Sequence, residues 1–294
     1  MSEAPAPLGI FAGAGSLPLR VAAAAAASGR GVRAVLLQGF AEPEPWSAHR
    51  SITLRLGALG SAIEWLRGEG VRQLVLAGHV RRPSMLSLRP DIASARYLAR
   101  IGARAFAGDD GLLSAIRDVL REEGFSLIGP NAVLTDLQVQ PGLLSRAAPD
   151  AATLADIARG VAVVRALGAL DVGQAAVVQQ GLVLGVEGVE GTDALLARCA
   201  ALRRDGPGGV LVKLVKPGQD RTLDLPALGP ATVQAAADSG LAGIAFEADG
   251  ALLVEREKTV RLADERGVFL LAMRPADHMP PQGPAGPTSS GEQR

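Results

Sequence analysis

The stretch Leu8-Gly-Ile-Phe-Ala-Gly13-Ala-Gly15-Ser-Leu-Pro18 decides the fold of the first half of the chain. Its apolar beginning predicts a short buried strand, and the alanine-rich sequence up to Ser28 predicts a helix. A strand, a glycine turn and a helix in this order typically begin a parallel sheet covered by helices. Such glycines let the backbone approach a phosphate at the helix N-terminus, but a ligand-free turn explains them equally well. Pro18 replaces the third glycine of the dinucleotide fingerprint.

Strands and helices continue to alternate through the first half. Strands are predicted at residues 32–37 and 74–77, and helices at residues 59–69, 92–106 and 112–123. Strands separated by helices of this length favour a parallel sheet with helices on both faces. Residues 1–128 are therefore predicted to form a Rossmann-like N-terminal domain.

The second half has a different pattern of elements. Prolines interrupt residues 129–150, which are predicted to form a linker. In residues 151–273, two apolar runs separated by Gln179-Gln180-Gly181 predict a hairpin. The later elements alternate, so we expect a distinct C-terminal α/β domain with a mixed sheet. Its helices are predicted at residues 153–167, 192–204, 230–237 and 258–266, and its strands at residues 175–178, 182–186, 209–213, 243–246, 252–254 and 268–272.

The composition is typical of a soluble globular protein. The 294 residues exceed what one core usually organises, which also favours two domains. Hydrophobic residues make up 48% of the chain, and 30 basic residues balance 30 acidic ones. General nucleic-acid binders carry a basic excess, so no nucleic-acid partner is expected.

The sequence shows no membrane-spanning, secretory or disulfide pattern. No run reaches the roughly 18 apolar residues of a transmembrane helix, and the N-terminus does not have the basic region and cleavage pattern of a signal peptide. Cys199 is the single cysteine and is predicted to be an inert core thiol. We therefore expect a cytoplasmic protein. Residues 274–294, rich in proline, glycine and serine, are predicted to be a disordered tail.

Charged side chains concentrate in the segment from Lys213 to Pro226. It holds two of the three lysines of the chain, Lys213 and Lys216, together with Asp220, Arg221 and Asp224. An apolar run precedes it, so the segment is expected where a buried strand meets a loop. Cations beside carboxylates that can bind a metal or take a proton suit phosphoryl chemistry. A solvated charged loop is the alternative interpretation.

Two shorter motifs in the first half have both a structural and a chemical interpretation. His79 follows Gly78 at the end of the third predicted strand, the edge at which doubly wound sheets bind ligands. It could donate to a phosphate or a base, or simply cap the strand. Asp109 and Asp110 precede a predicted helix, where N-capping is the favoured interpretation and a divalent-metal site the alternative.

The second half adds two acidic motifs, Asp171-Val-Gly-Gln174 and Glu187-Gly-Val-Glu190-Gly-Thr192-Asp193. Thr192 is an ordinary N-cap residue, so part of this pattern is structural. Together with the segment from Lys213 to Pro226, however, the second of these motifs places five carboxylates and three cations in one domain. Such a concentration favours a chemical role for this domain.

Taken in order, these motifs resemble the LpxI-type UDP-2,3-diacylglucosamine pyrophosphatases of lipid A biosynthesis. The resemblance covers residues 8–273. It implies hydrolysis of the pyrophosphate bond of UDP-2,3-diacylglucosamine to UMP and 2,3-diacylglucosamine 1-phosphate (lipid X), with water attacking the α-phosphorus. It also implies a divalent cation, usually Mg²⁺, and a substrate that lies between the two domains. The matching segments are residues 11–18, 77–83, 108–110, 171–174, 186–193 and 213–229.

The resemblance also implies roles for individual residues. Asp224, which precedes Leu225-Pro226, matches the essential aspartate of the family. Asp224, Asp109 and Asp110 are the candidate metal ligands. The candidate substrate contacts are Gly13, Ala14, Gly15, Ser16, Gly78, His79, Gln174, Thr192, Asp193, Lys213, Gln219 and Arg221.

A diacylated substrate has consequences for the partners of the protein. Two acyl chains require an apolar groove, and they imply transient contact with the cytoplasmic face of the inner membrane. Exposed apolar surface is the expected sign of that contact. A homodimer is left open.

Two other classes of protein compete with this interpretation. A Rossmann-type oxidoreductase would bind a dinucleotide at the first glycine turn, but Pro18 and the Leu37-Gln38 pair after the second strand, where an acidic residue is expected, disfavour it. A non-catalytic protein that binds a UDP-sugar lipid is compatible with the same residues.

Overall fold

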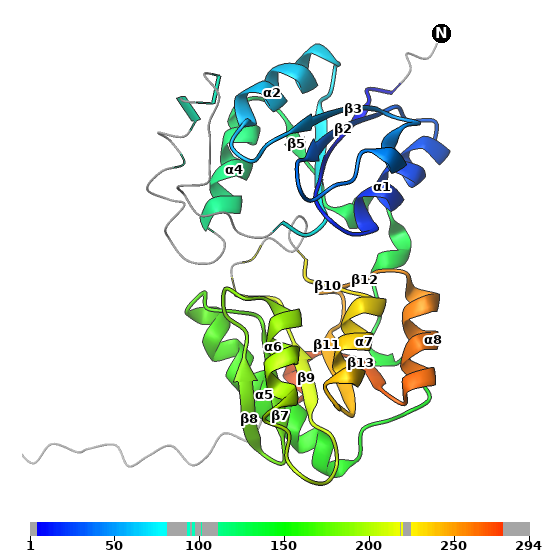
Figure 1. Ribbon diagram of the computed structural model, residues 1–294, viewed down its shortest axis with the longest axis vertical. Coiled ribbons are helices and arrows are strands. Elements are labelled where there is room, and N and C mark those ends of the chain that lie inside the picture. The colour runs from blue at the N-terminus through cyan, green and yellow to red at the C-terminus, as the bar shows by residue number, and fades with distance from the viewer. Residues whose placement is uncertain are drawn as a thin grey trace, which may run out of the picture.

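Residues 5–80, 93–94, 96–97, 101, 111–217, 219 and 225–278 are described by a computed structural model of the chain. These residues form two α/β domains, each built around its own sheet (Figure 1). The predicted helix at residues 92–106 lies largely outside the described residues, and so does the predicted tail beyond residue 278.

The N-terminal sheet is parallel and has the strand order β3-β2-β1-β4-β5. Rossmann-type sheets use this order for their first five strands. Helix α1 covers one face, and α2 and α4 cover the other. The predicted parallel sheet with helices on both faces is thus confirmed. The elements of this domain are β1 (Leu8–Ala12), α1 (Leu17–Ala27), β2 (Val32–Leu37), η1 (Glu44–Trp46), β3 (Arg50–Leu54), α2 (Leu59–Gly68), β4 (Gln73–Ala77), α4 (Gly111–Glu122) and β5 (Ser126–Leu127).

The sequence pattern missed strands β3 and β5. Strand β3 forms the edge of the sheet, and none of its five residues is fully buried. Strand β5 has only two residues. Both strands exist because they pair with a neighbour, β2 or β4, and apolar content alone does not reveal such pairing.

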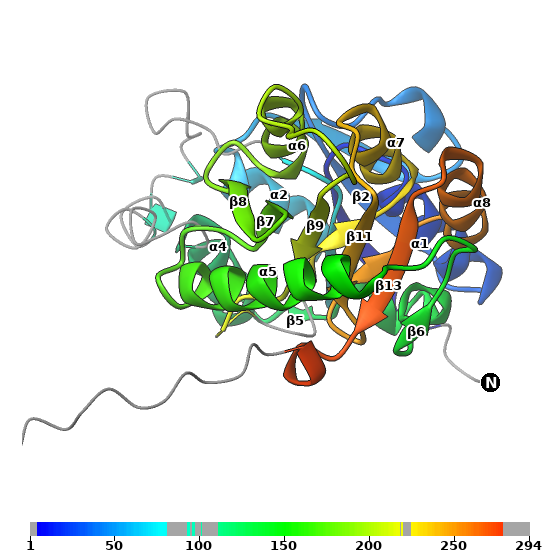
Figure 2. The same ribbon diagram turned by 90° about the horizontal axis from the view of Figure 1, so that it is seen from below.

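The C-terminal sheet has six strands in the order β6-β13-β11-β9-β7-β8, in which β6 spans Gly142–Leu143. Strands β9, β11 and β13 are parallel, whereas β6, β7 and β8 pair antiparallel, so the predicted mixed sheet is confirmed. Helix α5 covers one face of this sheet, and α6, α7 and α8 cover the other (Figure 2). The elements of this domain are α5 (Ala151–Ala169), β7 (Ala175–Gln179), β8 (Leu182–Val186), α6 (Thr192–Ala200), β9 (Val210–Lys213), α7 (Pro230–Asp238), β11 (Gly243–Glu247), α8 (Arg256–Arg266), β13 (Phe269–Met273) and η6 (Pro275–His278).

Two sequence predictions in this domain need correction. The helix predicted at residues 192–204 ends at Ala200, because a turn and a loop follow it. The apolar run at residues 252–254 does not join the main sheet. It forms β12 (Leu252–Leu253), which pairs with β10 (Ala227–Leu228) in a separate two-stranded sheet.

The segment between the two domains carries short elements of its own. These are η4 (Pro130–Ala132), η5 (Thr135–Leu137) and β6 (Gly142–Leu143). Strand β6 pairs with β13, so the end of this segment belongs to the C-terminal sheet.

The two domains share apolar contacts beside helix α1. Leu252 and Val254 lie in the same buried cluster as Leu17 and other core residues of the N-terminal domain. A polar contact adds to this junction, because the Ser16 hydroxyl donates to Glu255 at 2.9 Å. Arg20 also pairs at 2.6 Å with Asp136 of the segment between the domains. In Figure 1, β10 and β12 lie on the side of the C-terminal domain that faces α1.

Candidate functional site

The turns after β1 and β4 are joined through their backbones. Ala14 and His79 exchange two hydrogen bonds of 2.8 and 2.9 Å, and the Gly13 N–H donates to the Ala77 carbonyl at 2.8 Å. A Cβ atom on Gly13 would lie 2.7 Å from the His79 carbonyl oxygen, and one on Gly78 would lie 2.7 Å from the Ala14 carbonyl oxygen. Glycine is therefore required at both positions for the two turns to meet.

This glycine turn lies at the carboxyl edge of the parallel sheet, where doubly wound folds bind ligands. Gly15 has a φ of +95°, and no described atom lies within 4 Å of where its Cβ would be. Gly15, Ser16 and His79 are exposed. The structure thus brings together the six N-terminal candidates, of which Gly15, Ser16, Gly78 and His79 are exposed, Ala14 is half-buried and Gly13 is buried.

Ser16 connects this group to the second domain. It precedes α1 but does not cap that helix with its side chain. Its hydroxyl donates instead to Oε1 of Glu255 at 2.9 Å. That hydrogen bond, and a second one from Lys258, hold the pKa of Glu255 below its ordinary value.

The C-terminal candidates meet around a buried lysine. Lys213 ends β9 and is only 7% exposed. Its Nζ donates to the Thr192 hydroxyl at 2.7 Å, and this hydroxyl donates to Oε1 of Glu187 at 2.5 Å. Oε2 of Glu187 accepts from the Gln174 N–H at 3.0 Å. We call these four residues the Lys213 network.

The strand register explains why residues so distant in sequence meet here. Ala175 of β7 lies opposite Lys213 of β9, and Ala176 lies opposite Val186 of β8. The start of β7 and the ends of β8 and β9 therefore meet at one edge of the sheet. Helix α6 begins at the same edge, with Thr192 as its first residue.

Burial gives the Lys213 network an unusual electrostatic character. Desolvation lowers the pKa of Lys213, while the nearby carboxylates Glu187 and Asp193 oppose that shift. The Gln174 side-chain oxygen is buried, and no hydrogen-bond partner for it exists among the described residues. The edge therefore holds a desolvated cation and a buried acceptor that has no partner among the described residues.

A second lysine holds the adjoining loop. Lys216 Nζ lies 2.8 Å from Oδ1 of Asp171, and its backbone N–H donates to Oε1 of Gln219 at 3.1 Å. At Gly173 the loop runs so close to β8 that a Cβ would lie 2.1 Å from the Glu187 carbonyl oxygen. The candidates Gln174, Thr192, Asp193, Lys213 and Gln219 therefore share this end of the domain.

Several predicted residues lie outside the described part of the chain. These are Asp109, Asp110, Asp220, Arg221 and Asp224. The structure therefore does not place the predicted essential aspartate, Asp224, or the other candidate metal ligands. In the described ranges, no group of three or more His, Cys, Asp or Glu side chains could hold a metal ion.

Glu187 is a functional candidate to which the sequence predictions assigned no role. It accepts from both Thr192 and Gln174, so it connects two of the predicted substrate contacts. The hairpin pattern offered one signal, because the residue after the second strand of a hairpin must return to the start of the first strand.

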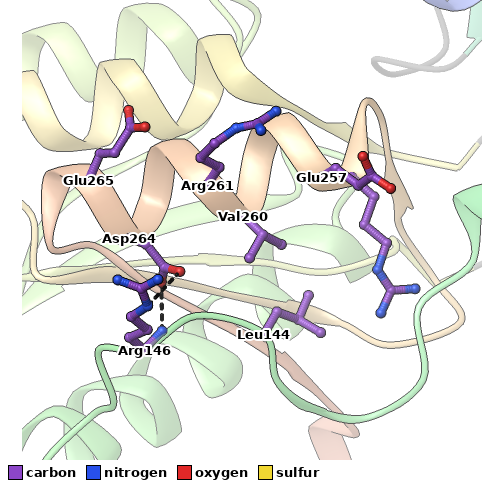
Figure 3. Close-up of a pocket in the computed structure, with 8 residues that line it drawn as sticks. Leu144, Arg146, Glu257, Val260, Arg261, Asp264 and Glu265 are labelled. Carbon is purple, nitrogen blue, oxygen red and sulfur yellow. Dashed lines mark hydrogen bonds and ion pairs between the residues drawn. The ribbon is translucent and has the colours of Figure 1, made fainter.

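A surface hollow of about 750 Å³ lies elsewhere, between Leu144 and helix α8 (Figure 3). The backbone N–H of Arg146 donates to Asp264 at 2.7 Å, and its side chain also faces that carboxylate. Arg256 and Arg261 are accompanied by Glu257 and Glu265, so the lining has no excess charge. None of the predicted site residues lines this hollow.

Cys199 is buried, as predicted, and burial raises its thiol pKa. Among the described residues, no helix is long and apolar enough to span a bilayer.

The fold and these two groups of residues define a two-domain α/β protein with a glycine turn in one domain and a buried lysine in the other. Comparison with known proteins identifies its family. Residues 7–137 match the family model of the LpxI N-terminal domain, and residues 140–271 match that of the LpxI C-terminal domain. The chain belongs to the LpxI family. It is 38% identical over 276 residues to the UDP-2,3-diacylglucosamine pyrophosphatase LpxI of Caulobacter vibrioides, which covers 92% of this chain and 98% of that protein.

Proposed function

We propose that this protein hydrolyses the pyrophosphate bond of UDP-2,3-diacylglucosamine to UMP and 2,3-diacylglucosamine 1-phosphate. The observation that carries this proposal is the match to both LpxI domains, together with 38% identity to a relative named for that activity. The likeness spans nearly the whole chain, so both domains have a counterpart in the relative.

The geometry of the described residues suits a substrate with a pyrophosphate. Its two negative charges repel an incoming hydroxide, and cations or N–H donors nearby offset that repulsion. In this proposal the glycine turn contributes backbone donors, and Lys213 contributes a cation that is held by Thr192 and Glu187. Lys213 is desolvated, and its charge therefore acts more strongly on a phosphate than that of an exposed lysine.

Water attacks the α-phosphorus in this proposal, and Asp224 is the residue that supports the attack. A carboxylate can do so by orienting the water or by holding a metal ion. The substrate lies between the glycine turn and the Lys213 network, and the two domains close around it. X-ray scattering profiles that stay the same when substrate or product is added would contradict domain closure.

The proposed metal is Mg²⁺, which prefers oxygen ligands. Two carboxylates at the described site are already engaged, since Glu187 accepts hydrogen bonds on both oxygens and Asp171 is paired with Lys216. Neither is arranged as a metal ligand. Asp224, Asp109 and Asp110, which the resemblance implies, are the proposed ligands, and a bound Mg²⁺ would neutralise charge on the phosphates.

The decisive experiment compares UMP release by the parent protein and by Asp224→Ala, with UDP-2,3-diacylglucosamine and Mg²⁺. We expect turnover by the parent and a loss of about a hundredfold or more in the variant, with substrate binding retained. Asp205→Ala serves as the matched control, because this exposed aspartate lies at the opposite edge of the C-terminal sheet.

The other outcomes also decide between functions. No turnover by the parent would leave a non-catalytic protein that binds the UDP-sugar lipid. Undiminished turnover by Asp224→Ala would transfer its role to Asp220 or to the pair Asp109 and Asp110. An NAD(P)H-dependent change in fluorescence would instead favour the oxidoreductase.

A further inference from the structure

A buried carboxylate completes the Lys213 network. Glu187 is only 5% exposed. Its Oε1 accepts from the Thr192 hydroxyl at 2.5 Å, and its Oε2 accepts from the Gln174 N–H at 3.0 Å. A carboxylate repels a substrate phosphate, and donors of the protein already occupy both oxygens of this one. Any role of Glu187 in the reaction is therefore exerted through a neighbour.

The Thr192 hydroxyl is that neighbour, because its two partners fix its direction. A hydroxyl has one hydrogen to donate and accepts through its lone pairs, whereas an ionised carboxylate only accepts and an ammonium group only donates. The hydroxyl hydrogen must therefore point to Glu187, and a lone pair must face Lys213 Nζ at 2.7 Å. With its hydrogen engaged in this way, the Thr192 hydroxyl has none to donate to a phosphate.

This arrangement leaves most of the Lys213 ammonium group unfilled. Nζ carries three hydrogens, and Thr192 accepts one of them. No other residue in the described ranges accepts from Nζ or forms an ion pair with it, although Lys213 is only 7% exposed. The hydroxyl thus separates the carboxylate from the cation. Two donors of a desolvated ammonium group remain for a phosphate oxygen, which is a strong acceptor.

Three elements meet in this bridge. Lys213 ends β9, Glu187 directly follows β8, and Thr192 is the first residue of α6. In Figure 1, β8 ends and α6 begins on the side of the C-terminal domain that faces the N-terminal domain. The unfilled donors of Lys213 therefore lie at the edge where the proposed substrate binds.

We propose that Glu187 is a positioning residue, which acts through the Thr192 hydroxyl to aim two N–H donors of Lys213 at a phosphate of the substrate. This inference rests on the proposed function, because that substrate supplies the phosphate. Glu187 itself does not touch the substrate. The Thr192 side chain serves as a bridge between carboxylate and lysine.

A double-mutant cycle on UMP release tests the route through Thr192. Glu187→Gln keeps the shape of the side chain but removes its charge, and Thr192→Val removes the hydroxyl. We expect each variant to lower kcat/KM about ten- to a hundredfold. Because both changes act on the same lysine, the double variant should lose no more than the more severe single variant. Losses that multiply in the double variant would overturn the proposal.

Glu190→Gln is the matched control for Glu187→Gln. Glu190 lies in the same loop, but it is exposed and pairs with Arg198 at 2.9 Å. Its substitution should change kcat/KM by less than about threefold. A control that loses as much as Glu187→Gln would overturn the positioning role.

A second comparison covers the case in which Glu187→Gln fails to fold, as judged by circular dichroism and thermal unfolding. Thr192→Ser keeps the bridging hydroxyl that Thr192→Val removes. We expect the serine variant to retain at least about tenfold more activity than the valine variant. Equal activity of the two would overturn the proposal, because the lysine would then be aimed without the bridge.

Lysine NMR gives a readout that does not depend on turnover. The chain has three lysines, Lys213, Lys216 and Lys258, so ¹³C-labelled lysine gives three side-chain titrations, and Lys213→Met assigns one of them. Burial lowers the pKa of Lys213, whereas the nearby carboxylates Glu187 and Asp193 oppose that shift. Glu187→Gln should therefore lower the pKa of Lys213 further, with the other two lysines as internal references.

The titration also separates this proposal from the proposed function. A pKa of Lys213 that is the same in the parent and in folded Glu187→Gln would overturn the positioning role, whatever the activities. Absence of UMP release by the parent would refute the proposed function. The titration would then decide by itself whether Glu187 holds the lysine.

Discussion

The glycine turn and the Lys213 network place polar groups at a sheet edge in two different ways. At the turn, backbone atoms of Gly13, Ala14, Gly78 and His79 hold the geometry, and side chains contribute little. In the network, the side chains of Lys213, Thr192 and Glu187 hold it. A backbone site tolerates changes of charge but not of volume. A side-chain site tolerates small changes of volume but not of charge, because its charges are desolvated.

The largest effect is expected from removing the buried charge in Lys213→Met. The substitution keeps most of the side-chain volume but leaves Glu187 without its cation. We expect kcat/KM for UMP release to fall about a hundred- to a thousandfold, as for the loss of one preorganised donor. Lys258→Met is the control, since Lys258 is 64% exposed and pairs only at the surface. Equal activity of the two variants would show that the network is merely structural.

The pH dependence of turnover should trace the same lysine. Burial lowers the pKa of Lys213, so this lysine loses its proton at a lower pH than an ordinary lysine. As the pH rises, kcat/KM should therefore begin to fall before the ordinary lysine pKa is reached, and above the pKa of Lys213 it should fall about tenfold per pH unit. Stability should move the other way. Between the folded and unfolded pKa values the unfolded chain binds more protons, so the free energy of unfolding rises with pH. Both trends should disappear in Lys213→Met, measured by rate profiles and denaturant titrations. If kcat/KM of Lys213→Met still falls at high pH, another group causes the fall.

The glycine turn should respond to volume, which Gly78→Ala adds. Gly78 has a φ of +91°, and the new Cβ would meet backbone atoms at 2.7 Å. We expect a loss of about 1–3 kcal/mol in unfolding free energy and of about tenfold in kcat/KM. Gly70→Ala is the matched control, because Gly70 also has a positive φ but its Cβ would meet no described atom within 4 Å. Comparable losses in both variants would show that the positive φ alone, and not the contact with the other turn, causes the loss.

The smallest effect is expected where the glycine turn meets the second domain, at Ser16 and Glu255. Ser16→Ala removes one exposed hydrogen bond, so we expect less than about 1 kcal/mol and less than about a threefold change in kcat/KM. Ser28→Ala, which removes a hydrogen bond at the other end of α1, is the control. A large loss in Ser16→Ala alone would show that the junction positions the glycine turn.

Much of the fold could be predicted from the sequence, because apolar residues recur at short, regular intervals along amphipathic helices and form continuous runs in buried strands. Strands β1, β2, β4, β7 and β8 and the helices around them fall where the pattern predicts. The edge strand β3 was missed because none of its residues is fully buried and three of the five are exposed, so it has no buried apolar run. Strand β6 was missed because two residues carry no period, and pairing with β13 alone defines it.

The sequence by itself determined the residue types of the site. The glycines at positions 13 and 78 and the lysine at position 213 were identifiable from strand ends and motif order. Only the tertiary structure decided which of these residues meet. Glu187 became part of the site because an antiparallel hairpin returns β8 to the start of β7, beside the end of β9. Hydrogen bonding and desolvation depend on atoms brought together across strands, and no local pattern of residues records those distances.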